Sequence, residues 1–138
     1  MRRAVLWVLG GALAVFGALS VVGPASIAAW VDIQLASGAA RADFRATYGG
    51  FEVGAAVFLI VCAARRDLTA IGLFAAGCIY AGFASGRLIG IVVDKPEGPL
   101  MLIVFVAEAA GAAAAFWMAH PAWRLPPADD PAMARRAA

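Results

Sequence analysis

Long apolar stretches alternate with short polar segments along the chain. A run of about 18 or more apolar residues can span a bilayer as a helix. Membrane β-strands are shorter, about ten residues, and alternate apolar with polar positions. The stretches here are longer and apolar on every side, so we predict an all-α fold with transmembrane helices over 4–29, 46–64, 68–93 and 100–119.

Polar segments separate the four stretches. Pro24 lies near the far end of the first stretch, where proline would kink or end a helix. Two prolines and a glycine between Asp94 and Pro99 predict a turn. Short loops favour antiparallel neighbours, so we predict an integral membrane four-helix bundle over residues 1–119. The proline- and alanine-rich segment 120–138 predicts a disordered cytoplasmic tail.

The composition excludes an ordinary soluble domain. Hydrophobic residues make up 64% of the 138 residues and charged residues 14%, against about 45–50% and about 25% in soluble domains. The start of the chain also resembles a secretory signal. Its apolar run from Ala4 to Val22 exceeds the ~7–15 residues of a signal core, so we expect a retained helix. The net charge of +2 gives no reason to expect nucleic-acid binding.

Basic residues are unevenly distributed between the two sides of the predicted bundle. One side would hold Arg41, Arg45 and Lys95, while Arg87 lies within a span. The side shared by both termini would hold Arg2, Arg3, Arg65, Arg66, Arg124, Arg135 and Arg136. Because basic residues concentrate on the cytoplasmic side, we predict a multi-pass protein of the inner membrane with both termini in the cytoplasm.

Small residues recur at four-residue spacing on three of the predicted helices. Such spacing lets helix backbones approach closely in lipid, where apolar side chains gain little by meeting one another. We therefore expect helix packing at Gly50, Gly54, Gly82, Gly86, Gly90 and Gly111.

Three ionisable side chains lie inside the predicted spans, each on a different helix. With a rise of ~1.5 Å per residue, Glu52, Arg87 and Glu108 lie about 9–12 Å below one surface. Each would cost ~2.5–3.5 kcal/mol in lipid, so such groups face protein or water and find partners. We expect Arg87 to pair with one or both glutamates.

Two further residues extend this group into a polar cluster. Arg45, Tyr48 and Glu52 follow the i, i+3, i+7 spacing of one α-helix face. With two carboxylates and Arg87, either Arg45 joins as a fourth charge or one glutamate is protonated. Three uses stay open: a structural lock, a periplasm-facing pocket that receives an anionic or zwitterionic group through the arginines, and a proton relay through the glutamates.

The remaining polar residues do not indicate a catalytic, metal or cofactor site. Cys62 and Cys78 do not form a Cys-x-x-Cys motif, and a disulfide within the membrane is not expected. His120 has no second ligand nearby in the sequence, so we expect no metal. No phosphate loop, dinucleotide fingerprint or nucleophile elbow is present.

One segment resembles a known family. The run Arg45-Ala46-Thr47-Tyr48-Gly49-Gly50, followed by Glu52, Gly86-Arg87 and Gly90, is similar to the domain-of-unknown-function 4345 type of small bacterial four-helix membrane proteins. The resemblance extends from the first helix to about Ala119. It implies the four-helix fold and its topology, and it draws attention to the polar cluster. It implies no chemistry.

Two classes of function fit these observations better than an enzyme. Small size and glycine-rich faces favour an accessory or assembly subunit that associates with another membrane protein or a second copy. The alternative is a binder or carrier of a small molecule or lipid headgroup that uses Arg45, Tyr48, Glu52, Arg87 and Glu108. An enzyme with Glu52 or Glu108 as acid or base has only their predicted burial in its favour.

Overall fold

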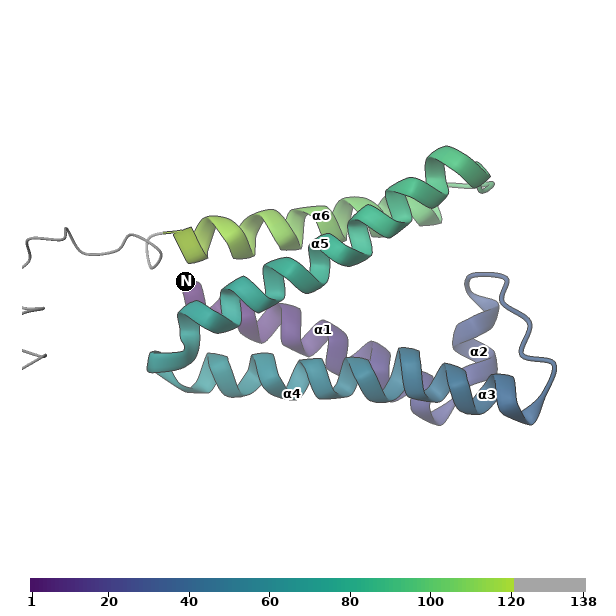
Figure 1. Cartoon of the computed structure of the whole chain (residues 1–138), viewed down its shortest axis with the longest axis horizontal. Coiled ribbons are helices and arrows are strands. Elements are labelled where there is room, and N and C mark those ends of the chain that lie inside the picture. The colour runs from purple at the N-terminus through teal and green to yellow at the C-terminus, as the bar shows by residue number, and fades with distance from the viewer. Residues whose placement is uncertain (121–138) are drawn as a thin grey trace, which may run out of the picture.

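The computed structural model describes residues 1–120, and over these residues it consists of helices and connecting loops (Figure 1). Residues 121–138, which include most of the expected tail, lie outside the described residues. The helices are α1 (Arg2–Val22), α2 (Pro24–Ala29), α3 (Gly38–Phe44), the π-helix η1 (Arg45–Gly50), α4 (Phe51–Ala64), the short η2 (Arg66–Leu68), α5 (Thr69–Asp94) and α6 (Leu100–Ala119).

Four helical segments are long and apolar enough to cross a membrane: Arg2–Val22, Gly38–Ala64, Arg66–Asp94 and Leu100–Ala119. Two of them differ from the predicted boundaries by more than two residues. The first was expected to reach residue 29, but it ends at Val22, and Pro24 begins the separate helix α2. Proline fits a first helical turn because its missing N–H would have no intrahelical partner there.

The second spanning segment begins eight residues before the predicted start at 46. Ser37 caps α3, because its hydroxyl oxygen accepts a hydrogen bond of 3.0 Å from the N–H of Ala40. Arg41 and Asp43 lie in this first part of the segment. Hydropathy alone therefore placed the start of the helix too late.

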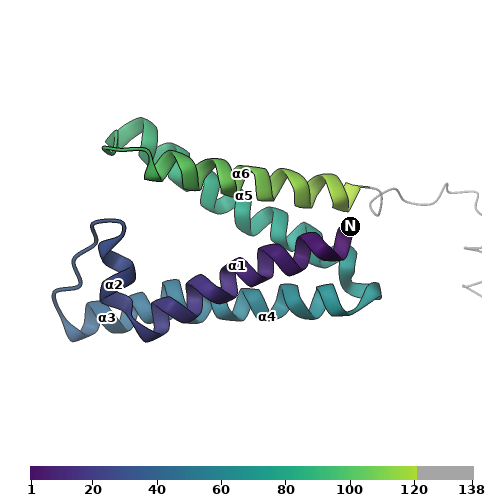
Figure 2. The ribbon, with the colours of Figure 1, turned by 180° about the vertical axis from the view of Figure 1, so that it is seen from behind.

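The four long apolar segments form two closely packed pairs (Figures 1 and 2). The first helix pair is α1 with η1 and α4, and the second helix pair is α5 with α6. The two pairs meet at the end that holds the N-terminus and the end of α6, and they diverge toward the opposite end. Space between the pairs is thus concentrated at the end that holds the 30–37 and 95–99 loops.

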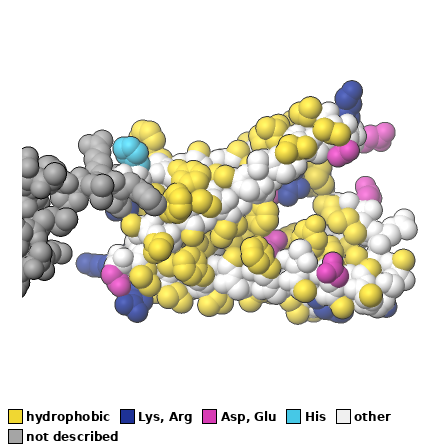
Figure 3. Space-filling model, in the orientation of Figure 1, with side chains coloured by type: hydrophobic (Ala, Val, Ile, Leu, Met, Phe, Trp, Pro, Cys, Tyr) yellow, Lys and Arg dark blue, Asp and Glu magenta, His cyan; other side chains and the backbone are white. Residues whose placement is uncertain are grey.

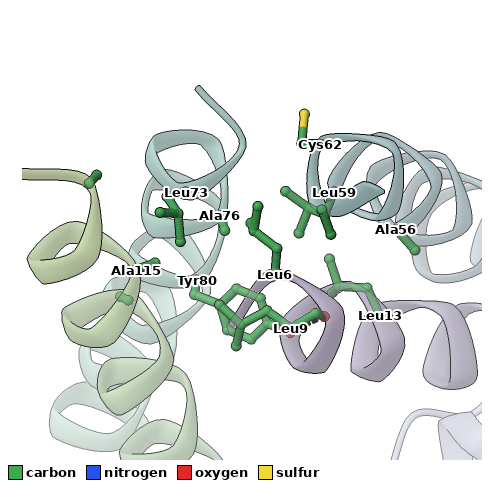
Figure 4. Close-up of a cluster of buried hydrophobic side chains, with 13 residues drawn as sticks. Leu6, Leu9, Leu13, Ala56, Leu59, Cys62, Leu73, Ala76, Tyr80 and Ala115 are labelled. Carbon is green, nitrogen blue, oxygen red and sulfur yellow. Dashed lines mark hydrogen bonds between the residues drawn. The ribbon is translucent and has the colours of Figure 1, made fainter. Parts of the chain in front are cut away.

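The buried core lies where the two helix pairs meet (Figure 4). Leu6 of α1, Leu59 of α4 and Leu73 of α5 are fully buried in it. The Tyr80 hydroxyl donates a 2.8 Å hydrogen bond to the Leu9 carbonyl oxygen, which connects α5 to α1. Close packing and polar contacts of this kind hold helices together in lipid.

Two arginines connect the ends of the first helix pair. Arg3 donates to the carbonyl oxygens of Ala63 and Ala64 at 2.5 and 3.1 Å, at the end of α4. Arg45 donates from Nε to the carbonyl oxygen of Val21 at 2.9 Å, at the end of α1. These carbonyl oxygens lie at the C-terminal ends of helices, where backbone carbonyls lack an intrahelical hydrogen-bond donor. They also form the negative end of the helix dipole, which attracts a cation. Each helix of the pair therefore has a cation at its C-terminal end.

Close helix contacts occur mostly at glycines other than the expected ones. A Cβ atom at Gly17 would lie 2.9 Å from the Val53 nitrogen, and one at Gly49 would lie 2.6 Å from Val21 Cγ2. Both glycines lie where α1 contacts the η1–α4 segment. Further close contacts involve Gly10, Gly72 and Gly77.

Of the six glycines predicted to pack helices, only Gly111 lies close to another described helix, with Leu9 and Tyr80 next to it. Nothing in the described chain lies within 4 Å of a Cβ placed at Gly54, Gly82 or Gly86. A Cβ at Gly50 would lie nearest to Arg45, and one at Gly90 nearest to Asp94. Each of these neighbours belongs to the same helical segment as its glycine. Within the described chain, Gly111 therefore makes a close contact of the expected kind and the other five do not, because four-residue spacing identifies a small-residue face but not the neighbour that covers it.

Candidate functional site

Arg87 of α5 and Glu108 of α6 form a two-pronged ion pair. Arg87 Nε donates to Glu108 Oε2 and Nη2 donates to Oε1, both at 2.8 Å. The side chains are 26% and 11% exposed. The planar guanidinium matches both carboxylate oxygens, which is a favourable way to hold opposite charges where water is scarce. The pairing expected for Arg87 is thus made with Glu108.

Glu52 lies in the first turn of α4 and is only 7% exposed. Within residues 1–120 it has neither a hydrogen bond nor a salt bridge. Buried carboxylates are normally paired or hydrogen-bonded because removing them from water is costly. Glu52 is therefore a largely buried acidic residue with no hydrogen bond or salt bridge within residues 1–120.

Glu52 faces a pocket of about 390 Å³ at the place where the two helix pairs diverge. The η1–α4 side contributes Thr47, Tyr48, Phe51 and Glu52, and the α5 side contributes Gly82, Phe83, Gly86 and Arg87. Figure 3 shows a hollow between the two helix pairs with acidic and basic atoms inside it. The pocket thus combines aromatic walls with an unpaired acid and one side of an ion pair.

The π-helix η1 shapes one wall of the pocket. Its i→i+5 hydrogen bonds widen the helix, and such segments are rare and often occur at functional sites. Tyr48 stacks on Phe44 with ring centroids 4.6 Å apart. It also lines the pocket.

The same π-helix explains why Arg45 does not join the cluster. The predicted common face of Arg45, Tyr48 and Glu52 assumed α-helical periodicity, which the wider turn interrupts. Arg45 is exposed and donates to the Val21 carbonyl instead, and it does not line the pocket. Of the two alternatives for balancing the charges, Arg45 as a fourth charge is therefore not seen in the described cluster.

Missing side chains at Gly82 and Gly86 make room for the pocket. A Cβ at either position would meet nothing within 4 Å among the described residues. Phe83, between them in sequence, lines the same pocket and contacts Tyr80 edge-to-face, with ring centroids 6.3 Å apart. The glycines expected to pack helices thus line open space instead.

A comparison with family models matches residues 1–119 to Domain of unknown function (DUF4345). The chain belongs to this family. Comparison with curated proteins and with solved structures gave no match. The DUF4345 match includes all four apolar helical segments and every pocket residue, so the pocket lies in the family domain.

In this DUF4345 chain the sequence predicted part of the site. Tyr48, Glu52 and Arg87 line the pocket, and Glu108 borders it through its ion pair with Arg87. The sequence did not indicate Thr47 or Phe51 as pocket residues. It also did not indicate that Gly82 and Gly86 would line open space. The position of Phe51 next to Glu52 in the sequence was the available signal.

The described residues offer no constellation of three or more His, Cys, Asp or Glu side chains that could hold a metal ion. Cys62 is buried and Cys78 is exposed, and both are free. The pocket and its border offer one acidic acceptor, an arginine already occupied by a carboxylate, and aromatic surface.

Proposed function

We propose that the protein binds a small molecule or lipid headgroup in the pocket between the two helix pairs, within a membrane. The observation that carries this proposal is Glu52, a buried acidic side chain that faces the pocket and has no partner within residues 1–120. A ligand in the pocket would supply that partner. A purely structural cluster would be expected to pair Glu52 within the chain, as it pairs Arg87 with Glu108.

The size and lining of the pocket support the same proposal. Small-molecule sites are typically concave, about 300–1,000 Å³, largely apolar and furnished with a few polar groups. The pocket measures about 390 Å³ and combines Phe51 and Phe83 with Tyr48, Glu52 and Arg87. This composition suits a molecule with one polar end and an apolar body.

A matched pair of leucine variants tests whether the pocket is a binding site. Gly86→Leu would place a side chain into the pocket, whereas Gly54→Leu adds the same volume outside it, and neither Cβ meets a described atom within 4 Å. Mass spectrometry of purified protein should detect a bound molecule in the native chain and in Gly54→Leu, and strongly reduced binding in Gly86→Leu. Equal binding by all three proteins would overturn the proposal.

An accessory or oligomerising role is the second candidate. Gly90 continues the four-residue repeat of Gly82 and Gly86 beyond the pocket lining, and no other described helix covers these glycines. A helix of a second copy or of another membrane protein would fit such a surface. Cross-linking in mild detergent should then give a defined oligomer that Gly90→Leu disrupts. A native chain that stays monomeric and co-purifies with no other protein would contradict this role.

We further propose that the chain is an inner-membrane bundle with both termini in the cytoplasm. The described end that holds the N-terminus carries Arg2, Arg3, Arg65 and Arg66, and the opposite end carries Arg41, Arg45 and Lys95. This bias, together with the arginines of the segment 121–138, supports the orientation. A reporter that fluoresces only in the cytoplasm should be bright when fused to the C-terminus and dark within 95–98. The reverse pattern would refute it.

A further inference from the structure

We propose that the ligand presents a protonated amine, a primary or secondary ammonium, to Glu52. This inference rests on the proposed function and specifies the chemistry that the pocket selects. The decisive juxtaposition is an unpaired, buried carboxylate in a pocket whose arginine is already neutralised by another carboxylate.

The charges of the site favour a cation over an anion. Arg87 and Glu108 neutralise each other through two hydrogen bonds. In its ionised form, Glu52 leaves one uncompensated negative charge next to that pair. A ligand with one positive charge balances this charge, whereas an anion would be repelled by Glu52.

The position of Arg45 removes the main support for an anion site. Sequence reasoning placed Arg45 and Arg87 together as two cations facing the pocket. Arg45 instead donates to the Val21 carbonyl outside the pocket. The third guanidinium nitrogen of Arg87, Nη1, has no oxygen acceptor. It lies 3.4 Å from the Met101 sulfur. A neutral or anionic oxygen next to the amine could meet that nitrogen, but Arg87 alone does not make an anion site.

The aromatic lining favours an organic cation over a metal ion. Tyr48, Phe51 and Phe83 line the same pocket as Glu52. Aromatic faces attract cations through their ring quadrupoles. Hard metal cations need several oxygen ligands, and within residues 1–120 no acidic cluster offers them. An ammonium can donate hydrogen bonds to the Glu52 carboxylate while its carbon atoms contact the rings.

Two sources can supply this group: a free alkylamine, or the aminoethyl headgroup of phosphatidylethanolamine. The shared chemistry is an ammonium attached to an apolar body. The pocket is lined by two of the apolar helical segments, Gly38–Ala64 and Arg66–Asp94, and in a bilayer both molecules can reach such a site.

The first experiment compares three octyl probes of equal chain length on protein in phosphatidylcholine nanodiscs: octylamine, octanol and octanoate. Binding is measured by calorimetry, and the signal that Gly86→Leu abolishes is the pocket contribution. We expect the native chain to bind octylamine at least tenfold more tightly than octanol or octanoate, the order of effect of a charge-assisted hydrogen bond.

The second experiment tests Glu52 directly. Glu52→Gln keeps the shape of the side chain and removes its charge, and Glu97→Gln makes the same change at an exposed position. We expect octylamine binding to fall at least tenfold in Glu52→Gln and to be unchanged in Glu97→Gln. The probe selectivity of the native chain tests the same point without any variant, should Glu52→Gln fail to fold.

The outcomes separate the inference from the function on which it rests. Pocket binding of octanoate or octanol as tight as that of octylamine would overturn the ammonium inference and leave a binding pocket. The absence of pocket binding by every probe, with no molecule co-purified, would overturn both. Nanodiscs that contain phosphatidylethanolamine assign the source. If this lipid weakens octylamine binding by competition, the lipid headgroup is the ligand. If octylamine still binds tightly without competition, the ligand is a free amine.

Discussion

Replacing Arg87 with alanine removes both hydrogen bonds of the buried ion pair and leaves two unpaired glutamates, Glu52 on α4 and Glu108 on α6. Breaking a buried pair from one side typically costs ~3–5 kcal/mol. The Arg87 side chain is 26% exposed and Glu108 is 11% exposed, so we expect the lower end, about 3 kcal/mol. That loss corresponds to more than a hundredfold change in the unfolding equilibrium, since ~1.4 kcal/mol is tenfold.

The assay is unfolding in mixed detergent micelles followed by circular dichroism. Arg66→Ala is the matched control, because Arg66 is exposed in η2, just before the start of α5. Exposed substitutions usually change stability by less than about 0.5 kcal/mol. Arg87→Lys should retain part of the stability, because lysine keeps the charge but lacks the planar fork.

The double variant Arg87→Met/Glu108→Met supplies the strongest test. Apolar residues of similar size often replace a buried ion pair without loss of stability. We therefore expect the double variant to be more stable than Arg87→Ala and close to the native chain. An Arg87→Ala protein as stable as Arg66→Ala would refute the argument, as would a double variant less stable than the single one.

The same unfolding assay checks three further predictions. Gly49→Ala should lose ~1–3 kcal/mol by overpacking, because its Cβ would lie 2.6 Å from an α1 side chain, while Gly54→Ala should be unchanged; equal effects would contradict the packing argument. Tyr80→Phe should lose ~0.6 kcal/mol, typical of a hydrogen bond between membrane helices, because it removes the bond to Leu9; no loss would show that this bond does not stabilise the fold. Arg45→Ala should lose ~0.3–1 kcal/mol, because it removes the cation at the C-terminal end of α1. A loss as large as that of Arg87→Ala would instead place Arg45 in the buried cluster.

The apolar helices and the Arg87–Glu108 pair could be predicted because lipid imposes strong constraints. A spanning segment must be long and apolar, so hydropathy finds it. A charge inside such a segment must find a partner, so similar depths on neighbouring helices indicated which residues meet. Both arguments use costs that hold whatever the detailed packing.

The π-helix and the glycine contacts could not be predicted by the same route. A hydrophobic pattern does not report a single wider turn, and that turn separated Arg45 from Tyr48 and Glu52. Glycine spacing reports which face is small but not what lies opposite it. Gly82 and Gly86 consequently line a pocket, while Gly17 and Gly49 make the close contacts.

The division into two helix pairs has a consequence for biosynthesis. Chains generally fold from the N-terminal part during synthesis, so the first helix pair, with an arginine contact at each end, can assemble before α5 and α6 are complete. Glu52 is then in place before Arg87 and Glu108, which belong to the second helix pair, dock beside it. The pocket comes into existence only when the second helix pair docks, so a ligand that binds there would stabilise the finished chain and not its precursors.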